Sequence, residues 1–277
     1  MPLTNPADSR FARLPGLCMH YLDWPGLADT VPVLLLHPNR TNSRVWDFVV
    51  GHSALPNRFL APDQRGHGLS DYPERGYSYA DYLGDLDAWL AQLDIARVHL
   101  VGAATGGNLA LLFASSQAHR VASLTVIDPG LSLDPAISAR VREQMVREFR
   151  FASLAEAREC MPFSARWSDA MKDHYSRYSF RALDDGSVEW RYFPAGVVET
   201  EHLLETPIWD RIRIVCPALI VRGAHSDVFP PENLARLRGL MPRSTSVEID
   251  ADHRVSQDNP QALAAAIDRF VEGCGSS

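Results

Sequence analysis

The sequence has 277 residues, of which 46% are apolar and 22% charged, a composition typical of a soluble globular protein. Its formal net charge is −7 and its basic residues are scattered, which argues against a nucleic-acid or anionic-membrane partner. No apolar run reaches the roughly 18 residues that a membrane-spanning helix needs. Because the first ten residues are polar and do not resemble a signal peptide, we expect a cytoplasmic protein.

Apolar segments of strand length alternate with helix-length amphipathic segments, which predicts a mostly parallel sheet with helices on both faces. An antiparallel edge strand is expected near the start of the chain, over Gly16 to Asp23. Six further strands are expected over residues 31–36, 58–61, 98–101, 124–127, 218–221 and 246–249. Helices are expected over residues 79–93, 107–116, 232–240 and 260–271.

The alternation stops between Pro129 and Arg213, where the chain becomes helical and rich in aromatic residues. A segment this long between two parallel strands is not an ordinary connection. We therefore expect a helical cap over residues 131–213, inserted into a core formed by residues 1–130 and 214–277. Such a cap would cover the carboxyl ends of the strands, where sheets of this kind bind ligands. A second domain packed elsewhere is the alternative.

Small residues connect a predicted strand to a predicted helix over residues 102–106, whose sequence is GAATG. This is the frame of the G-x-S-x-G motif, in which a serine projects from a sharp, strained turn above the sheet. Gly102 and Gly106 occupy the glycine positions, and Ala104 stands where the serine would be. Alanine carries no nucleophile, so the frame is present without its reactive group.

Together with four further segments in the same order, this frame resembles the α/β-hydrolase superfamily over essentially the whole chain. The segments are LHPN at 36–39, PDQRGHGLS at 62–70, RGAHSD at 222–227 and DHRV at 252–255. The resemblance implies an α/β-hydrolase fold: a mostly parallel eight-stranded sheet with helices on both faces and a helical cap.

The resemblance also implies a catalytic triad in the order nucleophile, acid, histidine. His253 would take a proton from the nucleophile at the position of Ala104 and pass it to the leaving group. Asp227, after the strand that follows the cap, would hold the imidazole in the correct tautomer. Asp128, at the end of the strand after the elbow, is the alternative acid.

The main-chain N–H groups of Asn39 and Thr105 are implied as the oxyanion hole, with Pro38 replacing the family's usual glycine. Arg40 and Arg44 are candidates for substrate binding, because an arginine suits a carboxylate or a polar carbonyl. Solvated loop residues are the alternative for both arginines.

Three aromatic residues of the cap are candidates for lining the pocket: Trp167, Tyr178 and Trp190. Aromatic residues at helical spacing also serve as simple packing. The chain shows no metal-binding spacing of histidine and cysteine and no nucleotide-binding glycine motif, so we expect neither a metal nor another cofactor. The expected partner is a small, partly apolar substrate, bound by a monomer or a homodimer.

Three explanations of Ala104 remain open: replacement of a native serine, a pseudoenzyme that binds without turnover, and a different chemistry that needs only His253. The cofactor-independent dioxygenases of this fold are an example of the third. The retained acid, base and elbow glycines favour the first explanation. We therefore predict a serine-type hydrolase that cleaves an ester, lactone or amide through an acyl-enzyme, with carbon–carbon hydrolysis as an alternative.

Overall fold

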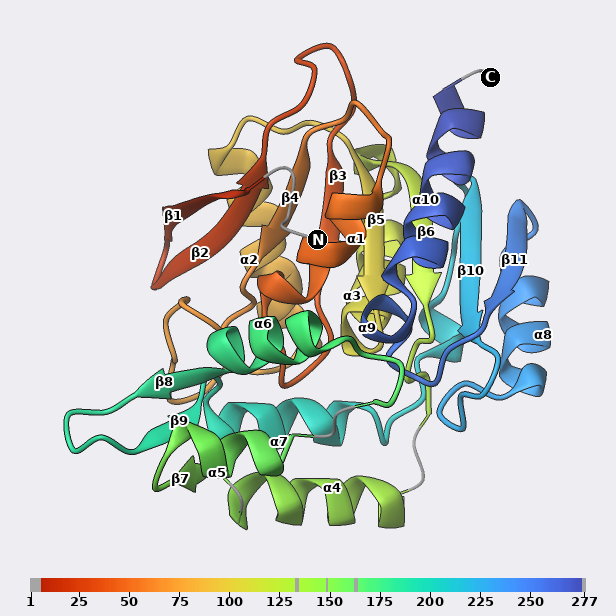
Figure 1. Ribbon diagram of the computed structural model, residues 1–277. Helices are drawn as coiled ribbons and strands as arrows, with labels where there is room; N and C mark the ends of the chain where they lie inside the picture. The colour runs from red at the N-terminus through yellow and green to blue at the C-terminus, as the bar shows by residue number, and fades with distance from the viewer. Residues whose placement is uncertain (1–5, 133–134, 148, 162–163, 276–277) are drawn as a thin grey trace.

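The computed structural model describes residues 6–132, 135–147, 149–161 and 164–275. A few residues of the predicted core (1–130 and 214–277) and of the predicted cap (131–213) therefore lie outside the described residues. An eight-stranded sheet forms its centre, in the order β1-β2-β4-β3-β5-β6-β10-β11 (Figure 1). β1 and β2 are antiparallel to their neighbours, and the other strands run parallel to one another. The predicted fold class is confirmed. The strands are β1 Asp8–Leu14, β2 Leu17–Trp24, β3 Val33–Leu36, β4 Phe59–Pro62, β5 Val98–Ala103, β6 Val121–Ile127, β10 Ala218–Gly223 and β11 Ser244–Ile249.

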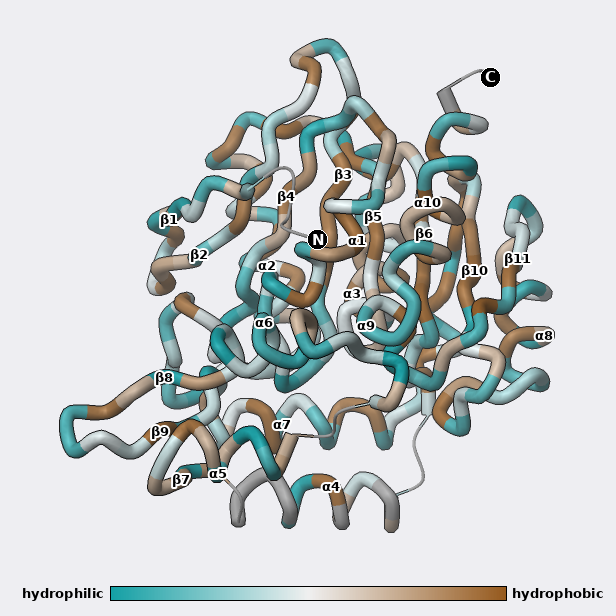
Figure 2. The backbone as a smooth tube through the Cα atoms, viewed as in Figure 1, coloured by the Kyte–Doolittle hydropathy of each residue, from teal (hydrophilic) through white to brown (hydrophobic). Residues whose placement is uncertain are grey.

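Helices cover both faces of the sheet, and β3 shows why its sequence is apolar throughout. Leu34 and Leu36 belong to the core cluster under α2, α3 and α8, whereas Val33 and Leu35 belong to the cluster under α1 and α10. Successive side chains of a strand point to opposite faces, so a strand covered on both sides is apolar at every position. Figure 2 shows the hydrophobic colour concentrated in the central strands. The helices are α1 Asp47–His52, α2 Tyr79–Gln92, α3 Thr105–Ser116, α8 Pro231–Leu240 and α10 Pro260–Gly275.

β1 is the one strand of this sheet that the sequence did not predict. It pairs with β2 along its whole length, from Asp8 opposite Asp23 to Leu14 opposite Leu17. Only Ala12 and Leu14 of β1 are buried, so the strand lacks the apolar alternation on which the prediction depended. An exposed edge strand is held by its backbone ladder more than by its side chains.

The segment between β6 and β10 lies at the carboxyl end of the sheet, with α4, α6 and α7 beyond the strand ends (Figure 1). It is not wholly helical, because three short strands form a second sheet in the order β7-β9-β8. Phe180 and Trp190 are paired residues of β8 and β9, and their rings lie in tilted contact with centroids 4.2 Å apart. The elements are α4 Pro135–Arg147, β7 Arg150–Phe151, α5 Leu154–Glu159, α6 Asp169–Ser179, β8 Phe180–Ala182, β9 Val188–Trp190 and α7 Pro194–Leu203.

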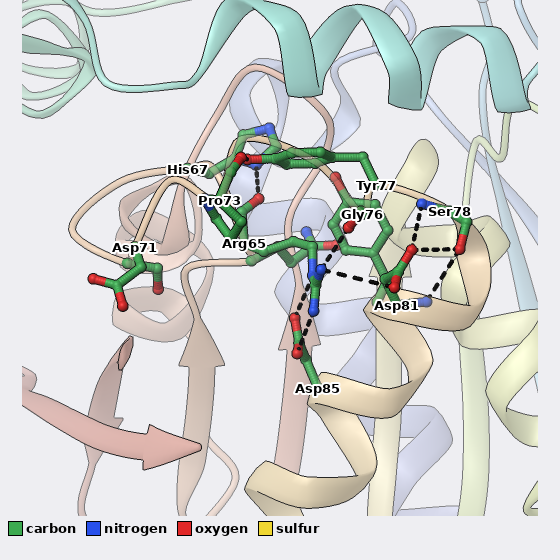
Figure 3. Close-up of polar contacts among 12 residues, drawn as sticks. Arg65, His67, Asp71, Pro73, Gly76, Tyr77, Ser78, Asp81 and Asp85 are labelled. Atoms are coloured by element: carbon green, nitrogen blue, oxygen red, sulfur yellow. Dashed lines mark hydrogen bonds and ion pairs between the residues drawn. The ribbon is translucent and has the colours of Figure 1, made fainter. Parts of the chain in front are cut away.

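Buried ionic contacts brace the turn that follows β4. Arg65 donates two hydrogen bonds to the carboxylate of Asp85, each 2.6 Å long, and a third to the carbonyl of Gly76 (Figure 3). The buried carboxylate of Asp63 accepts hydrogen bonds from the main-chain N–H groups of Ser43 and Leu69, 2.7 and 2.8 Å long. This turn is therefore a rigid support beneath the loop after β3. In the part of the chain that the structure describes, no helix is long and apolar enough to span a membrane.

Candidate active site

The turn between β5 and α3 has the strained geometry that its small residues predict. Ala104 adopts φ 48° and ψ −116°, a backbone conformation that residues other than glycine rarely adopt. A Cβ on Gly102 would lie 2.2 Å from the carbonyl oxygen of Gly106, and one on Gly106 would lie 2.4 Å from that of Leu36. Both positions therefore need glycine. Thr105 begins α3, so its N–H precedes the first intrahelical hydrogen bond.

His253 is held by a buried carboxylate. Its Nδ1 lies 2.7 Å from Oδ1 of Asp128, whose side chain is only 1% exposed. Asp128 also accepts hydrogen bonds from the N–H of Gly223, 2.8 Å away, and from the hydroxyl of Ser226, 2.5 Å away. Because a carboxylate only accepts, Nδ1 of His253 carries the proton, and Nε2 is left as the basic nitrogen.

The expectation that Asp227 holds this imidazole is therefore wrong, and the alternative acid Asp128 occupies that position. Asp227 is exposed in the turn after β10. The same turn directs Ser226 inward to Asp128, so the neighbouring Asp227 faces solvent. Chain order places the family's usual acid in this turn, but it does not fix the direction in which a side chain of a tight turn points.

Backbone strain gathers at this site. The described residues include four non-glycine residues with positive φ: Arg40, Asp94, Ala104 and Asp128. Ala104 is at the elbow, Asp128 holds His253, and Arg40 lies on the loop beside them with φ 63°. Such conformations each cost of the order of 1 kcal/mol or more and are concentrated in functional sites.

A cavity of about 350 Å³ lies between the elbow and the cap. Ala104, Thr105, Asn39 and His253 all line it, so the structure brings the expected nucleophile position, base and oxyanion donors together. Its volume suits a small molecule. Two wider hollows at other surfaces contain none of these residues. Among the cap residues that line the cavity are Phe151, Met161, Trp167, Trp190 and Tyr192.

Two of the residues expected to bind substrate are not among those that line this cavity. The guanidinium of Arg44 lies 4.6 Å from the centre of the Tyr178 ring and 3.4 Å from Oδ2 of Asp47. Arg44 and Tyr178 thus join the loop after β3 to α6 by packing on each other. The prediction that they bind substrate is therefore wrong. Arg40, Trp167 and Trp190 do line the cavity.

The loop that carries Asn39 is fixed from both the core and the cap. The Asn39 side chain donates to Oε2 of Glu201 on α7, 3.1 Å away. The N–H of Arg40 is shared between Oδ1 of Asn39, at 3.2 Å, and Nε2 of His67, at 3.3 Å. Burial, together with the charge of His37, lowers the pKa of His67 to about 3, so this ring is neutral and can accept through Nε2.

Sequence reasoning missed two charged residues of the cavity, Glu201 and Arg254. Arg254 directly follows His253, and that adjacency was a usable signal. Glu201 lies within a cap helix of ordinary composition, and nothing in the sequence indicates that its carboxylate reaches Asn39.

The chain belongs to the Alpha/beta hydrolase family, whose sequence model matches residues 33–266. It is 29% identical over 252 residues to the 2-(acetamidomethylene)succinate hydrolase of Mesorhizobium japonicum, covering 87% of each chain. It is 27% identical over 267 residues to the N-formylmaleamate deformylase of Pseudomonas putida, covering 93% of this chain and 94% of the relative. These relatives are hydrolases.

Solved structures show the same fold. That of E-2-(acetamidomethylene)succinate hydrolase superposes with a TM-score of 0.86 at 23% identity, covering 96% of this chain and 99% of the other. That of a deformylase from Pseudomonas putida S16, solved as a serine-to-alanine variant, superposes with a TM-score of 0.75 at 21% identity, covering 94% and 99%.

Proposed function

We propose that this chain is a serine-type hydrolase of small molecules in which alanine replaces the nucleophile at position 104. One observation carries the proposal. A histidine oriented by the buried carboxylate of Asp128 lines the same cavity as the methyl group of Ala104, which stands on a strained elbow. A binding protein has no need of an oriented base at this place.

The geometry supports a two-step acyl transfer in the Ala104→Ser form. Nε2 of His253 would take the proton of the serine hydroxyl as that oxygen attacks the substrate carbonyl. The N–H groups of Thr105 and Asn39 would stabilise the oxyanion, and protonated His253 would donate its proton to the leaving group. Water activated by His253 would then release the acyl group, with Asp128 stabilising the imidazolium in both steps.

The bond to be cleaved is proposed from the relatives. Two relatives that cover most of this chain are named for substrates with an acetamido or an N-formyl group. A third, the 3-hydroxybutyrate-oligomer hydrolase of Cupriavidus necator, is 25% identical over 272 residues. We favour the carbonyl of a small N-acyl compound, with esters and lactones as the second class.

The test restores the hydroxyl. Ala104→Ser protein is expected to hydrolyse 4-nitrophenyl acetate at least about a thousandfold faster than the alanine form, because the nucleophile supplies most of the catalysis. It should also react with a fluorophosphonate probe, and His253→Ala in the serine form should abolish both reactions. A folded serine form that is silent with the probe, esters and N-acyl amides would favour a ligand-binding protein.

A further inference from the structure

The hydroxyl of Ser226 contacts the acid of the proposed relay, the pair formed by Asp128 and His253. It donates to Oδ1 of Asp128 over 2.5 Å, and the same oxygen lies 2.7 Å from Nδ1 of His253. The other carboxylate oxygen, Oδ2, accepts from the N–H of Gly223 at 2.8 Å. Two donors, the serine of the turn and the histidine, therefore share one oxygen of the acid.

The surroundings of Ser226 fix the direction of its hydroxyl proton. Its oxygen accepts from the main-chain N–H groups of Val228, at 3.2 Å, and of Phe229, at 3.4 Å. A serine oxygen has two lone pairs and one proton. Because both lone pairs face N–H donors, the proton is left to point at Asp128. The residue is only 6% exposed, so water has little access to take its place.

A buried arginine braces the turn that carries this serine. Arg222, near the end of β10, donates from Nε to the carbonyl of Phe229 at 2.8 Å and from Nη2 to the carbonyl of Ser226 at 3.2 Å. Its Nη1 lies 2.8 Å from Oε1 of Glu248 on β11. The backbone of the turn is thus held from within, and the hydroxyl of Ser226 is presented to Asp128 from a fixed position.

Sharing one oxygen limits what the acid can do for the imidazole. A carboxylate stabilises a neighbouring imidazolium by its negative charge, and a hydrogen bond that it accepts from another group offsets part of that charge. Ser226 therefore makes the ring of His253 hold its proton less firmly than Asp128 alone would. A base must be free of its proton to take one from a nucleophile, so this effect favours the working form of Nε2.

We propose that Ser226 is a positioning residue that acts through Asp128: it fixes Oδ1 toward His253 and keeps the imidazole from holding its proton too tightly to serve as a base. The proposal rests on the proposed function, in which His253 is that base. It adds the feature that sets the pH range in which the site works, namely the turn after β10.

The alanine form allows a test that needs no turnover. The titration of the His253 imidazole is followed by NMR in the chain and in Ser226→Ala, with the signal assigned by its loss in His253→Gln. We expect the midpoint in Ser226→Ala to lie about 0.5–1 pH unit higher, because a hydrogen bond to a charged group contributes an energy of this order. A midpoint that stays in place, or moves lower as a merely loosened carboxylate would cause, would overturn the proposal.

Charged side chains around the relay are the same in these variants, so a difference in midpoint reports the hydroxyl. They include Arg222 and Asp227 of β10 and its turn, Asp252, Arg254 and Asp258 beside His253, and Arg40 and Glu201 of the cavity lining.

Matched variants separate the hydroxyl from packing. Ser226→Thr keeps an O–H donor and should keep the midpoint, whereas Ser226→Cys, whose S–H is a weak donor, should move it part of the way. Ser123→Ala removes a buried hydroxyl that lies 2.8 Å from Nδ1 of His99, and should leave the His253 midpoint unchanged. An equal shift in Ser123→Ala or in Ser226→Thr would contradict the assigned role. Melting temperatures report folding, and Ser226→Cys carries the test if Ser226→Ala does not fold.

The kinetic test uses the Ala104→Ser form. There Ser226→Ala should lower kcat for 4-nitrophenyl acetate about tenfold through lost orientation, and should move the acidic limb of kcat/KM to higher pH with the NMR midpoint. A lower kcat with an unmoved limb would reduce Ser226 to a structural contact. The two proposals fail separately: an inactive Ala104→Ser form with a shifted midpoint would overturn the hydrolase alone, and activity with an unshifted midpoint would overturn the role of Ser226 alone.

Discussion

The core and the cap contribute to the same cavity by different means. In the core, Ala104, Asp128 and His253 follow the ends of three strands, and Asp128 is held by three short hydrogen bonds in a fully buried position. In the cap, the lining is mostly apolar or aromatic, and the cap joins the core through scattered contacts such as Asn39 to Glu201. The proposed chemistry thus depends on core residues held in place by the sheet. Substrate selectivity would depend on cap side chains, which can be substituted without disturbing that sheet.

The acid of the core gives the largest expected effect. In the Ala104→Ser form, Asp128→Asn should lower kcat for 4-nitrophenyl acetate by about 10⁴-fold, because an amide can favour the wrong imidazole tautomer. Asp227→Asn, with the same change at an exposed position, should alter kcat by less than about twofold. Steady-state kinetics of the two variants decide between these acids, and the opposite order would restore Asp227.

The rigidity of the elbow predicts the next largest effect. Gly106→Ala should destabilise the chain by about 3 kcal/mol, because its Cβ would be forced against the carbonyl of Leu36. Gly239→Ala in α8 meets no atom within 4 Å and should instead stabilise it by about 0.5–1 kcal/mol. Urea unfolding of both variants measures the contrast. Equal effects would show that the elbow is less closely packed than its geometry indicates.

Acid should weaken the core at Asp63. Burial raises the pKa of this carboxyl, but the hydrogen bond and charge of His20, the charge of His37 and the hydrogen bond from Ser43 together outweigh burial and lower it from 3.8 to about 2. Because the pKa is lower in the folded state, the ionised carboxylate stabilises the fold at pH values above the unfolded-state pKa. This stabilisation, about 2 kcal/mol, is lost as the pH falls from about 4 to 2.

The measurement is the difference in unfolding free energy between the chain and Asp63→Asn at pH 6 and at pH 2.5. This difference should shrink as the pH falls, because the ionised carboxylate is lost. If Asp63→Asn does not fold, the carboxyl titration followed by NMR replaces it. A difference that does not change with pH would contradict the lowered pKa of Asp63.

The contact between cap and core gives the smallest effect. In the Ala104→Ser form, Glu201→Ala should lower kcat about tenfold, because the oxyanion loop loses its anchor on α7. Glu201→Gln keeps an oxygen that accepts from Asn39 and should retain most of the activity. Equal losses in both variants, or a loss explained by a lower melting temperature, would remove Glu201 from loop positioning.

The buried centre of the sheet was easier to predict from the sequence than its exposed edge and the cap. Six of the eight central strands were predicted as parallel strands, and the helices α2, α3, α8 and α10 were predicted as their cover, whereas the short helix α1 was not. Most of these six strands are apolar throughout, because both of their faces are buried. The strand expected over Gly16 to Asp23 is antiparallel as predicted, but it is not at the edge, because β1 pairs with its outer side. β1 and the small cap sheet were missed, since partly exposed strands carry little apolar alternation.

The sequence by itself determined the strand order along the chain, the elbow glycines, the missing hydroxyl at Ala104 and the place of His253. These follow from local rules, because a turn too tight for a side chain needs glycine wherever it occurs. Only the tertiary structure decided that Asp128 and not Asp227 meets the imidazole, and that Arg40 and Arg254 line the same cavity. Those choices depend on the direction of side chains from separate strand ends, which chain order does not specify.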